Sequence, residues 1–132
     1  MLKSYFNTIL LLGFFAVLIV GILIYWRKKE VAVNRVWFLA SVSASLWSLF
    51  YFLTINAPNK EIAIILIKIV HTLGLIVVVL WFYFVTVFLE INKKGENKKI
   101  FILLTLGSVE AFILNFSPWF MKDMVPKQFF NY

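Results

Sequence analysis

Long apolar runs separated by short polar segments organise this chain from end to end. The runs cover about residues 5–26, 36–55, 62–89 and 100–116. None of them alternates with a period of two, and each is longer than the roughly 10-residue strand of a membrane barrel. About 20 apolar residues cross the hydrocarbon core as a helix, which satisfies its own backbone groups in lipid. The pattern therefore predicts an all-α integral membrane protein with four transmembrane helices in an antiparallel bundle.

The segments outside these runs refine the prediction. The first run is followed by basic residues and is longer than the roughly 7–15-residue core of a signal peptide, so we expect it to be retained. Residues 117–132 mix aromatic, charged and proline residues and are too interrupted to span. We expect them to form an extracytoplasmic or interfacial tail.

The composition excludes several classes of protein. Hydrophobic residues make up 63% of the chain and charged residues 14%, which is far from the usual shares of about 45–50% and about 25%. A soluble or disordered chain is therefore excluded, because the apolar excess would be exposed to water. The chain has no cysteine, which excludes disulfides and thiolate metal sites. Its net charge of +7 fits basic loops at a membrane better than nucleic-acid binding.

The distribution of Lys and Arg predicts a sidedness. Eight basic residues lie in the first and third loops: Arg27, Lys28, Lys29, Arg35, Lys93, Lys94, Lys98 and Lys99. Four lie on the other side: Lys3, Lys60, Lys122 and Lys127. Basic loops stay in the cytoplasm, so we expect a multi-pass protein of the cell membrane with its N-terminus outside.

Polar side chains inside the apolar runs are the candidate functional residues, because such residues are expensive in lipid. They are Lys68, His71, Glu110 and Asn115. Lys68 and Glu110 would lie about 9–10 Å from the outer ends of adjacent helices. We hypothesise a Lys68–Glu110 pair with His71 beside it, acting as a latch or as the floor of a pocket open to the outside. The alternatives are that Lys68 snorkels to the interface and that His71 is a satisfied core residue.

A row of small residues in the second run predicts close helix packing, because small side chains let helices approach in lipid. The packing residues are Ala40, Ser41, Ala44, Ser45, Trp47 and Ser48. Trp47 falls near the membrane centre, where its indole N–H needs a partner.

Motifs for catalysis are not found in the sequence. It contains no glycine-rich nucleotide loop, no His-Glu-x-x-His motif and only one histidine. We expect no catalytic residue, no metal, no cofactor and no nucleic-acid partner.

Several segments resemble a known family. Residues 34–39 (Asn-Arg-Val-Trp-Phe-Leu) and 45–51 (Ser-Leu-Trp-Ser-Leu-Phe-Tyr) are similar to the second helix of the N-terminal seven-transmembrane sensor region of bacterial histidine kinases. The third run is similar too, with Lys68-Ile69, Gly74 and the aromatic residues 81–84, and Asn115 matches a late polar position. One departure is the aliphatic stretch 75–79, where that family often has a proline.

The resemblance implies the signal-input region of a two-component histidine kinase or a similar receptor. Residues 1–132 would be a partial sensor domain without a soluble catalytic domain, truncated before helices five to seven and the output domain, which could equally be a cyclase. Its partners would be the lipid bilayer, other transmembrane helices (a homodimer among them) and a small ligand from the outer side.

Two other classes remain open. Small multidrug exporters also have four helices, but they place an acidic residue in the first helix, and the first run here has none. An accessory membrane protein that acts only through helix packing is the other alternative.

Overall fold

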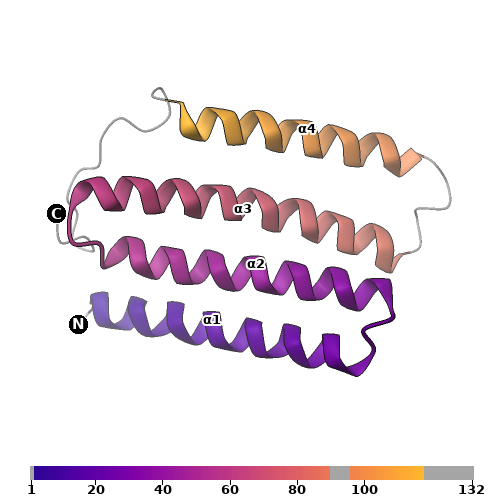
Figure 1. The fold of residues 1–132 in the computed structure, drawn as a ribbon, viewed down its shortest axis with the longest axis horizontal. Helices are drawn as coiled ribbons and strands as arrows, with labels where there is room; N and C mark the ends of the chain where they lie inside the picture. The colour runs from indigo at the N-terminus through magenta and orange to yellow at the C-terminus, as the bar shows by residue number, and fades with distance from the viewer. Residues whose placement is uncertain (1, 90–95, 118–132) are drawn as a thin grey trace.

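The computed structural model describes residues 2–89 and 96–117. These residues form four helices in chain order: α1 (Leu2–Arg27), α2 (Ala32–Ile55), α3 (Lys60–Phe88) and α4 (Glu96–Phe116). The predicted all-α architecture is confirmed, and the helices run alternately up and down (Figure 1).

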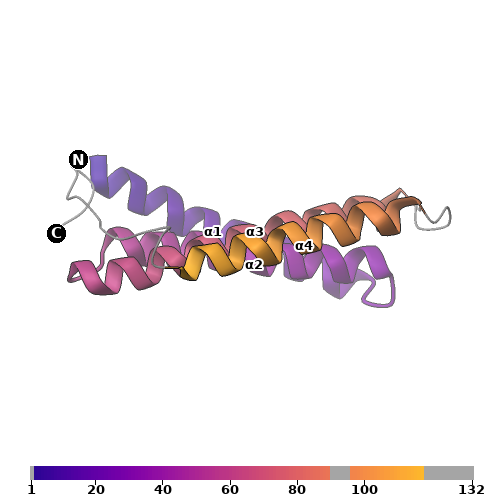
Figure 2. The same cartoon turned by 90° about the horizontal axis from the view of Figure 1, so that it is seen from above.

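The four helices lie side by side in an open row. Within the described ranges, each helix contacts only its neighbours in the chain: α1 with α2, α2 with α3, and α3 with α4. Figures 1 and 2 show the row from its broad side and from above. An open row leaves apolar side chains uncovered, which water would penalise but lipid does not. On α1, for example, Leu12 is 63% exposed and Leu23 is 57% exposed.

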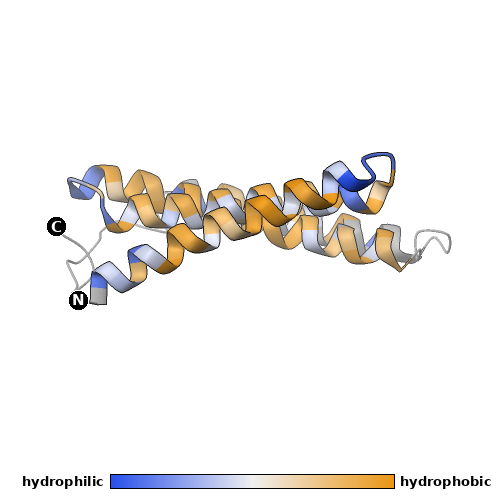
Figure 3. Cartoon of the chain, turned by 90° about the horizontal axis from the view of Figure 1, so that it is seen from below, coloured by the Kyte–Doolittle hydropathy of each residue, from blue (hydrophilic) through white to orange (hydrophobic). Residues whose placement is uncertain are grey.

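Three of the helices are long and apolar enough to cross a membrane, at Lys3–Arg27, Ala32–Ile55 and Lys60–Phe88. Figure 3 shows that these helices are hydrophobic over most of their length. This confirms the first three predicted spans as helices of sufficient length and hydropathy. The fourth helix, α4, is 21 residues long and is not among these three.

The helix ends differ from the apolar runs by a few residues, because a helix continues into polar residues where its backbone bonds allow. The second helix begins at Ala32, before its apolar run, and α4 begins at Glu96. The start of α3 is fixed by Asn59, whose side chain accepts a hydrogen bond of 2.9 Å from the backbone N–H of Ile62. This is the geometry of an N-cap, which satisfies one of the unpaired N–H groups of the first turn.

The contact between α1 and α2 is close because glycine faces serine. A Cβ atom added at Gly21 would lie 2.5 Å from the Cβ of Ser41, which is closer than real carbon atoms approach. Farther along, the hydroxyl of Ser48 donates a 2.9 Å hydrogen bond across the interface to the backbone oxygen of Leu10. The backbones therefore approach as they do in small-residue interfaces of membrane helices.

Polar and aromatic contacts join the helices near their two ends. At one end, Asn7 and Asn56 exchange side-chain hydrogen bonds of 3.1 and 3.0 Å between α1 and α2. At the other, the ring of Trp37 on α2 packs against Phe84 and Trp81 of α3, with ring centroids 5.0 and 5.8 Å away. Within the described residues, the buried indole N–H of Trp37 has no hydrogen-bond partner.

Candidate functional site

Asn115 is the residue through which α4 is bonded to α3. Its side chain is only 2% exposed. The amide nitrogen donates to the backbone oxygen of Lys68 at 2.7 Å and to the hydroxyl of Thr72 at 3.3 Å. The amide oxygen lies 3.3 Å from Nδ1 of His71. One asparagine therefore contacts three residues, at positions 68, 71 and 72, on one face of α3.

These contacts fix the protonation of one nitrogen of His71. The backbone oxygen of Lys68 can only accept, so it must face the amide nitrogen of Asn115, and the amide oxygen must then face His71. An amide oxygen also only accepts, so Nδ1 of His71 has to carry a proton for this contact to be a hydrogen bond. The imidazole is thus held as an Nδ1–H donor within the seam between α3 and α4.

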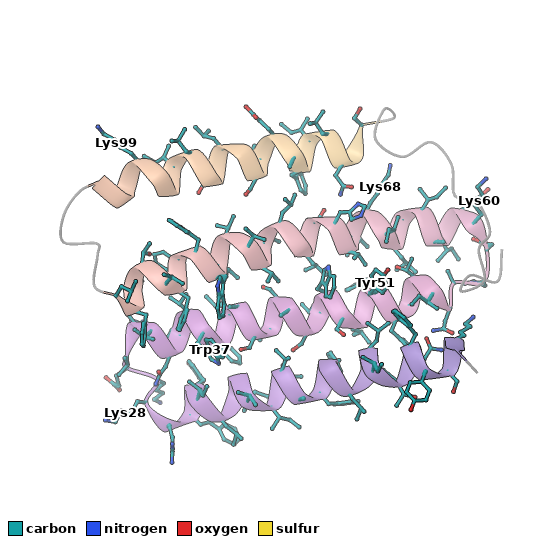
Figure 4. All side chains as sticks on the ribbon, turned by 180° about the vertical axis from the view of Figure 1, so that it is seen from behind. Lys28, Trp37, Tyr51, Lys60, Lys68 and Lys99 are labelled. Atoms are coloured by element: carbon teal, nitrogen blue, oxygen red, sulfur yellow. The ribbon has the colours of Figure 1, made fainter. Side chains whose placement is uncertain are left out.

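The structure does not contain the hypothesised Lys68–Glu110 ion pair in its described part. Glu110 is exposed, and it precedes Asn115 by five residues, which turns it about 140° away from the side of α4 that faces α3. The same five residues displace it about 7.5 Å along the helix axis. Lys68 is half-buried and extends from α3 toward the side on which α4 lies (Figure 4). At the level of Lys68 along the helices, α3 contacts Asn115 of α4 and not the carboxylate of Glu110.

A cavity of about 360 Å³ opens beside this hydrogen-bonded cluster. Three helices line it: Trp47 comes from α2, His71 and Gly74 from α3, and Asn115 from α4. The remaining lining side chains are apolar: Val70, Leu75, Val78, Ala111 and Leu114. The arrangement can hold an apolar molecule and offer it polar groups at one edge.

Gly74 makes room for the Trp47 ring. A Cβ at Gly74 would lie 3.5 Å from Nε1 of Trp47 and 3.7 Å from its Cδ1. The indole is 40% exposed and lies 5.7 Å from the Tyr51 ring, between centroids. Among the described residues its N–H has no hydrogen-bond partner, so the donor that the sequence singled out is available to an acceptor in the cavity.

A second cavity, of about 300 Å³, lies along the same seam. It is formed by Thr72, Leu75, Ile76, Val79 and Leu80 of α3 with Thr105, Ser108, Val109 and Phe112 of α4. Leu75 lines both cavities. The seam between α3 and α4 is therefore loosely filled, whereas that between α1 and α2 is close enough for glycine and serine to touch.

The residues singled out for helix packing occupy two different places. Ala40, Ser41, Ser45 and Ser48 are buried, and Ala44 is half-buried. Ser45 bonds within its own helix, to the backbone oxygen of Ser41 at 2.7 Å. Trp47 points instead to the cavity at α3 and α4.

Thr72 is the functional candidate that sequence reasoning missed. Its hydroxyl donates to the backbone oxygen of Lys68 at 3.0 Å and accepts from Asn115. Its position four residues after Lys68, next to His71, was the available signal. Within residues 2–89 and 96–117, no group of three or more His, Cys, Asp or Glu could hold a metal ion.

The comparison with known families decides what kind of region this is. A family model described as the N-terminal 7TM region of histidine kinase matches residues 9–128. The chain belongs to this family. The match extends over nearly all of the helical part of the chain, and it confirms the resemblance seen in the sequence. Since this family is the sensor region of a kinase and not its catalytic domain, the chain is a membrane sensory input region. No curated protein and no solved structure matches it.

Proposed function

We propose that the four helices form the first part of a seven-helix input region that controls the output of a histidine kinase. The observation that carries this proposal is the family match, which begins within α1 and continues past the end of α4. The open row supports it, because a row of four helices leaves an apolar flank on α4 against which further helices of such a region could pack.

In this proposal α4 also crosses the membrane, and the chain lies in the cell membrane with its N-terminus outside. The outward side of α4 is apolar: Leu103 is 67% exposed and Ile113 is 63% exposed. The basic loop between α1 and α2 and the basic residue Lys99 at the start of α4 then lie in the cytoplasm. The Asn115 cluster lies toward the outer side.

The cavity beside Asn115 is the site where the signal acts in this proposal. Its polar edge consists of the indole N–H of Trp47 and of His71 and Asn115, whose side chains already contact each other, and its other walls are apolar. An uncharged, lipid-soluble molecule with a hydrogen-bond acceptor fits this chemistry. Binding there would favour one spacing of α3 and α4 over another, and helix shifts of about 1–2 Å are a common means of signal transfer.

The control of a kinase is tested in native membranes. Codons 9–128 are deleted in frame at the chromosomal locus, and phosphohistidine on membrane kinases is quantified by mass spectrometry in deletion and parent strains. We expect the steady-state phosphorylation of one histidine kinase to change severalfold. An unchanged phosphohistidine profile would refute the proposed control.

The orientation is tested with single cysteines, because the native sequence has none. Lys28→Cys and Asn59→Cys place a thiol at opposite ends of α2. With a membrane-impermeant maleimide, we expect labelling at position 59 in intact cells and labelling at position 28 only after permeabilisation. The reverse pattern would overturn the orientation and leave the kinase experiment unaffected.

A further inference from the structure

The connection between α1 and α2 contains a basic cavity that the sensory function does not use. Its volume is about 440 Å³, and Ile24, Arg27, Lys28 and Asn34 line it. Two of these four side chains are cations, one is an amide and one is aliphatic. No carboxylate lines the cavity, and within the described residues neither Arg27 nor Lys28 has an ion-pair partner.

The backbone around the cavity is held in place by hydrogen bonds. The backbone oxygen of Lys28 accepts from the side-chain amide of Asn34 at 3.0 Å and from the backbone N–H of Val31 at 3.2 Å. These two bonds tie the end of α1 to the first turn of α2. The cavity is thus bounded by a fixed turn, not only by long side chains on an open surface.

The cavity lies where lipid headgroups meet hydrocarbon. Trp26 beside it is 76% exposed, and Tyr25 packs on Phe38 with ring centroids 4.8 Å apart. Exposed tryptophan and tyrosine at the ends of spanning helices belong to the membrane interface. Ile24 is on the hydrocarbon side of this level, and Arg27 and Lys28 are on the headgroup side.

From this arrangement we propose that the cavity binds the phosphodiester headgroup of an anionic phospholipid. Arg27 supplies a planar guanidinium that can donate two parallel hydrogen bonds to one phosphate, and Lys28 supplies a compact charge. Ile24 contacts the start of an acyl chain. Basic pockets between transmembrane helices bind such headgroups. The bound lipid anchors the end of α1 against the start of α2.

The experiment distinguishes a lipid site formed by the cavity residues from nonspecific attraction of lipid to the charge of the whole loop. Native mass spectrometry of the purified protein in detergent is performed with equimolar phosphatidylglycerol and phosphatidylcholine. The double variant Arg27→Gln/Lys28→Gln removes the cations that line the cavity. The matched control, Lys29→Gln/Arg35→Gln, removes the same charge from the same segment but leaves the cavity residues intact. Circular dichroism and size-exclusion profiles verify the fold of both.

We expect the wild type and the control to retain phosphatidylglycerol in preference to phosphatidylcholine. We expect this preference to fall about 10- to 30-fold in the cavity variant, because it lacks the usual contribution of two basic residues and each 1.4 kcal/mol of binding free energy corresponds to about a tenfold factor. Equal losses in the two variants would show diffuse charge and overturn the site. A wild type without preference would overturn it as well. Displacement of the lipid by millimolar glycerol phosphate would identify a soluble phosphate as the ligand and overturn the lipid assignment.

Discussion

The contact between Gly21 and Ser41 makes the packing of α1 on α2 sensitive to a single methyl group. In Gly21→Ala, the new Cβ would lie 2.5 Å from Cβ and 3.0 Å from Oγ of Ser41. Carbon atoms pack best at about 3.5–4.0 Å, so the helices must separate by roughly 1 Å. Because both carbons are attached directly to helical backbone, rotation of a side chain cannot relieve the contact.

The expected cost exceeds the gain in helix propensity. Overpacking of this kind costs about 1–3 kcal/mol, whereas alanine in place of glycine gains at most about 1 kcal/mol within a helix. We expect Gly21→Ala to lower the free energy of unfolding by about 1–2 kcal/mol, which changes the folded-to-unfolded ratio about 5- to 30-fold. The assay is reversible unfolding in mixed micelles with a graded denaturing detergent.

Gly107→Ala is the matched control, because a Cβ at that position meets nothing within 4 Å. We expect this variant to be neutral or slightly stabilised. A second variant, Gly21→Ala with Ser41→Gly, removes the atoms that the new methyl group meets and should recover most of the loss. The reasoning is refuted if Gly21→Ala is no less stable than Gly107→Ala, or if the double variant recovers nothing.

Three further predictions follow from the interhelical contacts. Asn115→Leu removes the bonds from α4 to α3 and should lower the unfolding free energy by about 1–2 kcal/mol, measured in the same assay; an unchanged value would contradict the role of Asn115. Ser48→Ala removes the hydrogen bond to the Leu10 backbone and should lower the unfolding free energy by only about 0.6 kcal/mol. A loss above about 2 kcal/mol would be more than one interhelical hydrogen bond contributes and would contradict this prediction. Gly74→Ala brings a methyl group into van der Waals contact with Trp47 and should shift tryptophan emission while leaving stability within about 1 kcal/mol; an unshifted spectrum would place the indole elsewhere.

The apolar pattern was sufficient to predict the helices, because membrane helices must be apolar over their whole length and need no partner to satisfy their backbone. The apolar pattern was insufficient to predict how the helices are arranged relative to one another. When every side of a helix is apolar, as on α1, periodicity does not reveal which side meets another helix. The sequence therefore predicted an antiparallel bundle without predicting that its four helices lie in an open row.

The candidate site was predicted only in part for a similar reason. Comparison of depths suggested that Lys68 would meet Glu110, since both are charged and lie at similar distances from the helix ends. The rotation of α4 about its own axis decides the matter, and this rotation directs Asn115 to α3 and Glu110 away from it. His71 and Asn115 were both candidates from the sequence, but their mutual contact and the part of Thr72 required the register of the two helices.

The most direct test of the proposed input site is to fill its cavity and measure kinase output. Ala111→Phe places a ring in the cavity beside Asn115, whereas Ala16→Phe adds the same atoms to an exposed position of α1. Both are introduced at the chromosomal locus, and phosphohistidine on the associated kinase is quantified in native membranes. A bias of about 1 kcal/mol between two helix spacings changes their ratio about fivefold, so we expect a change of this order for Ala111→Phe and none for Ala16→Phe. Equal phosphorylation in the wild type and in Ala111→Phe, with both proteins present at equal levels, would contradict the account.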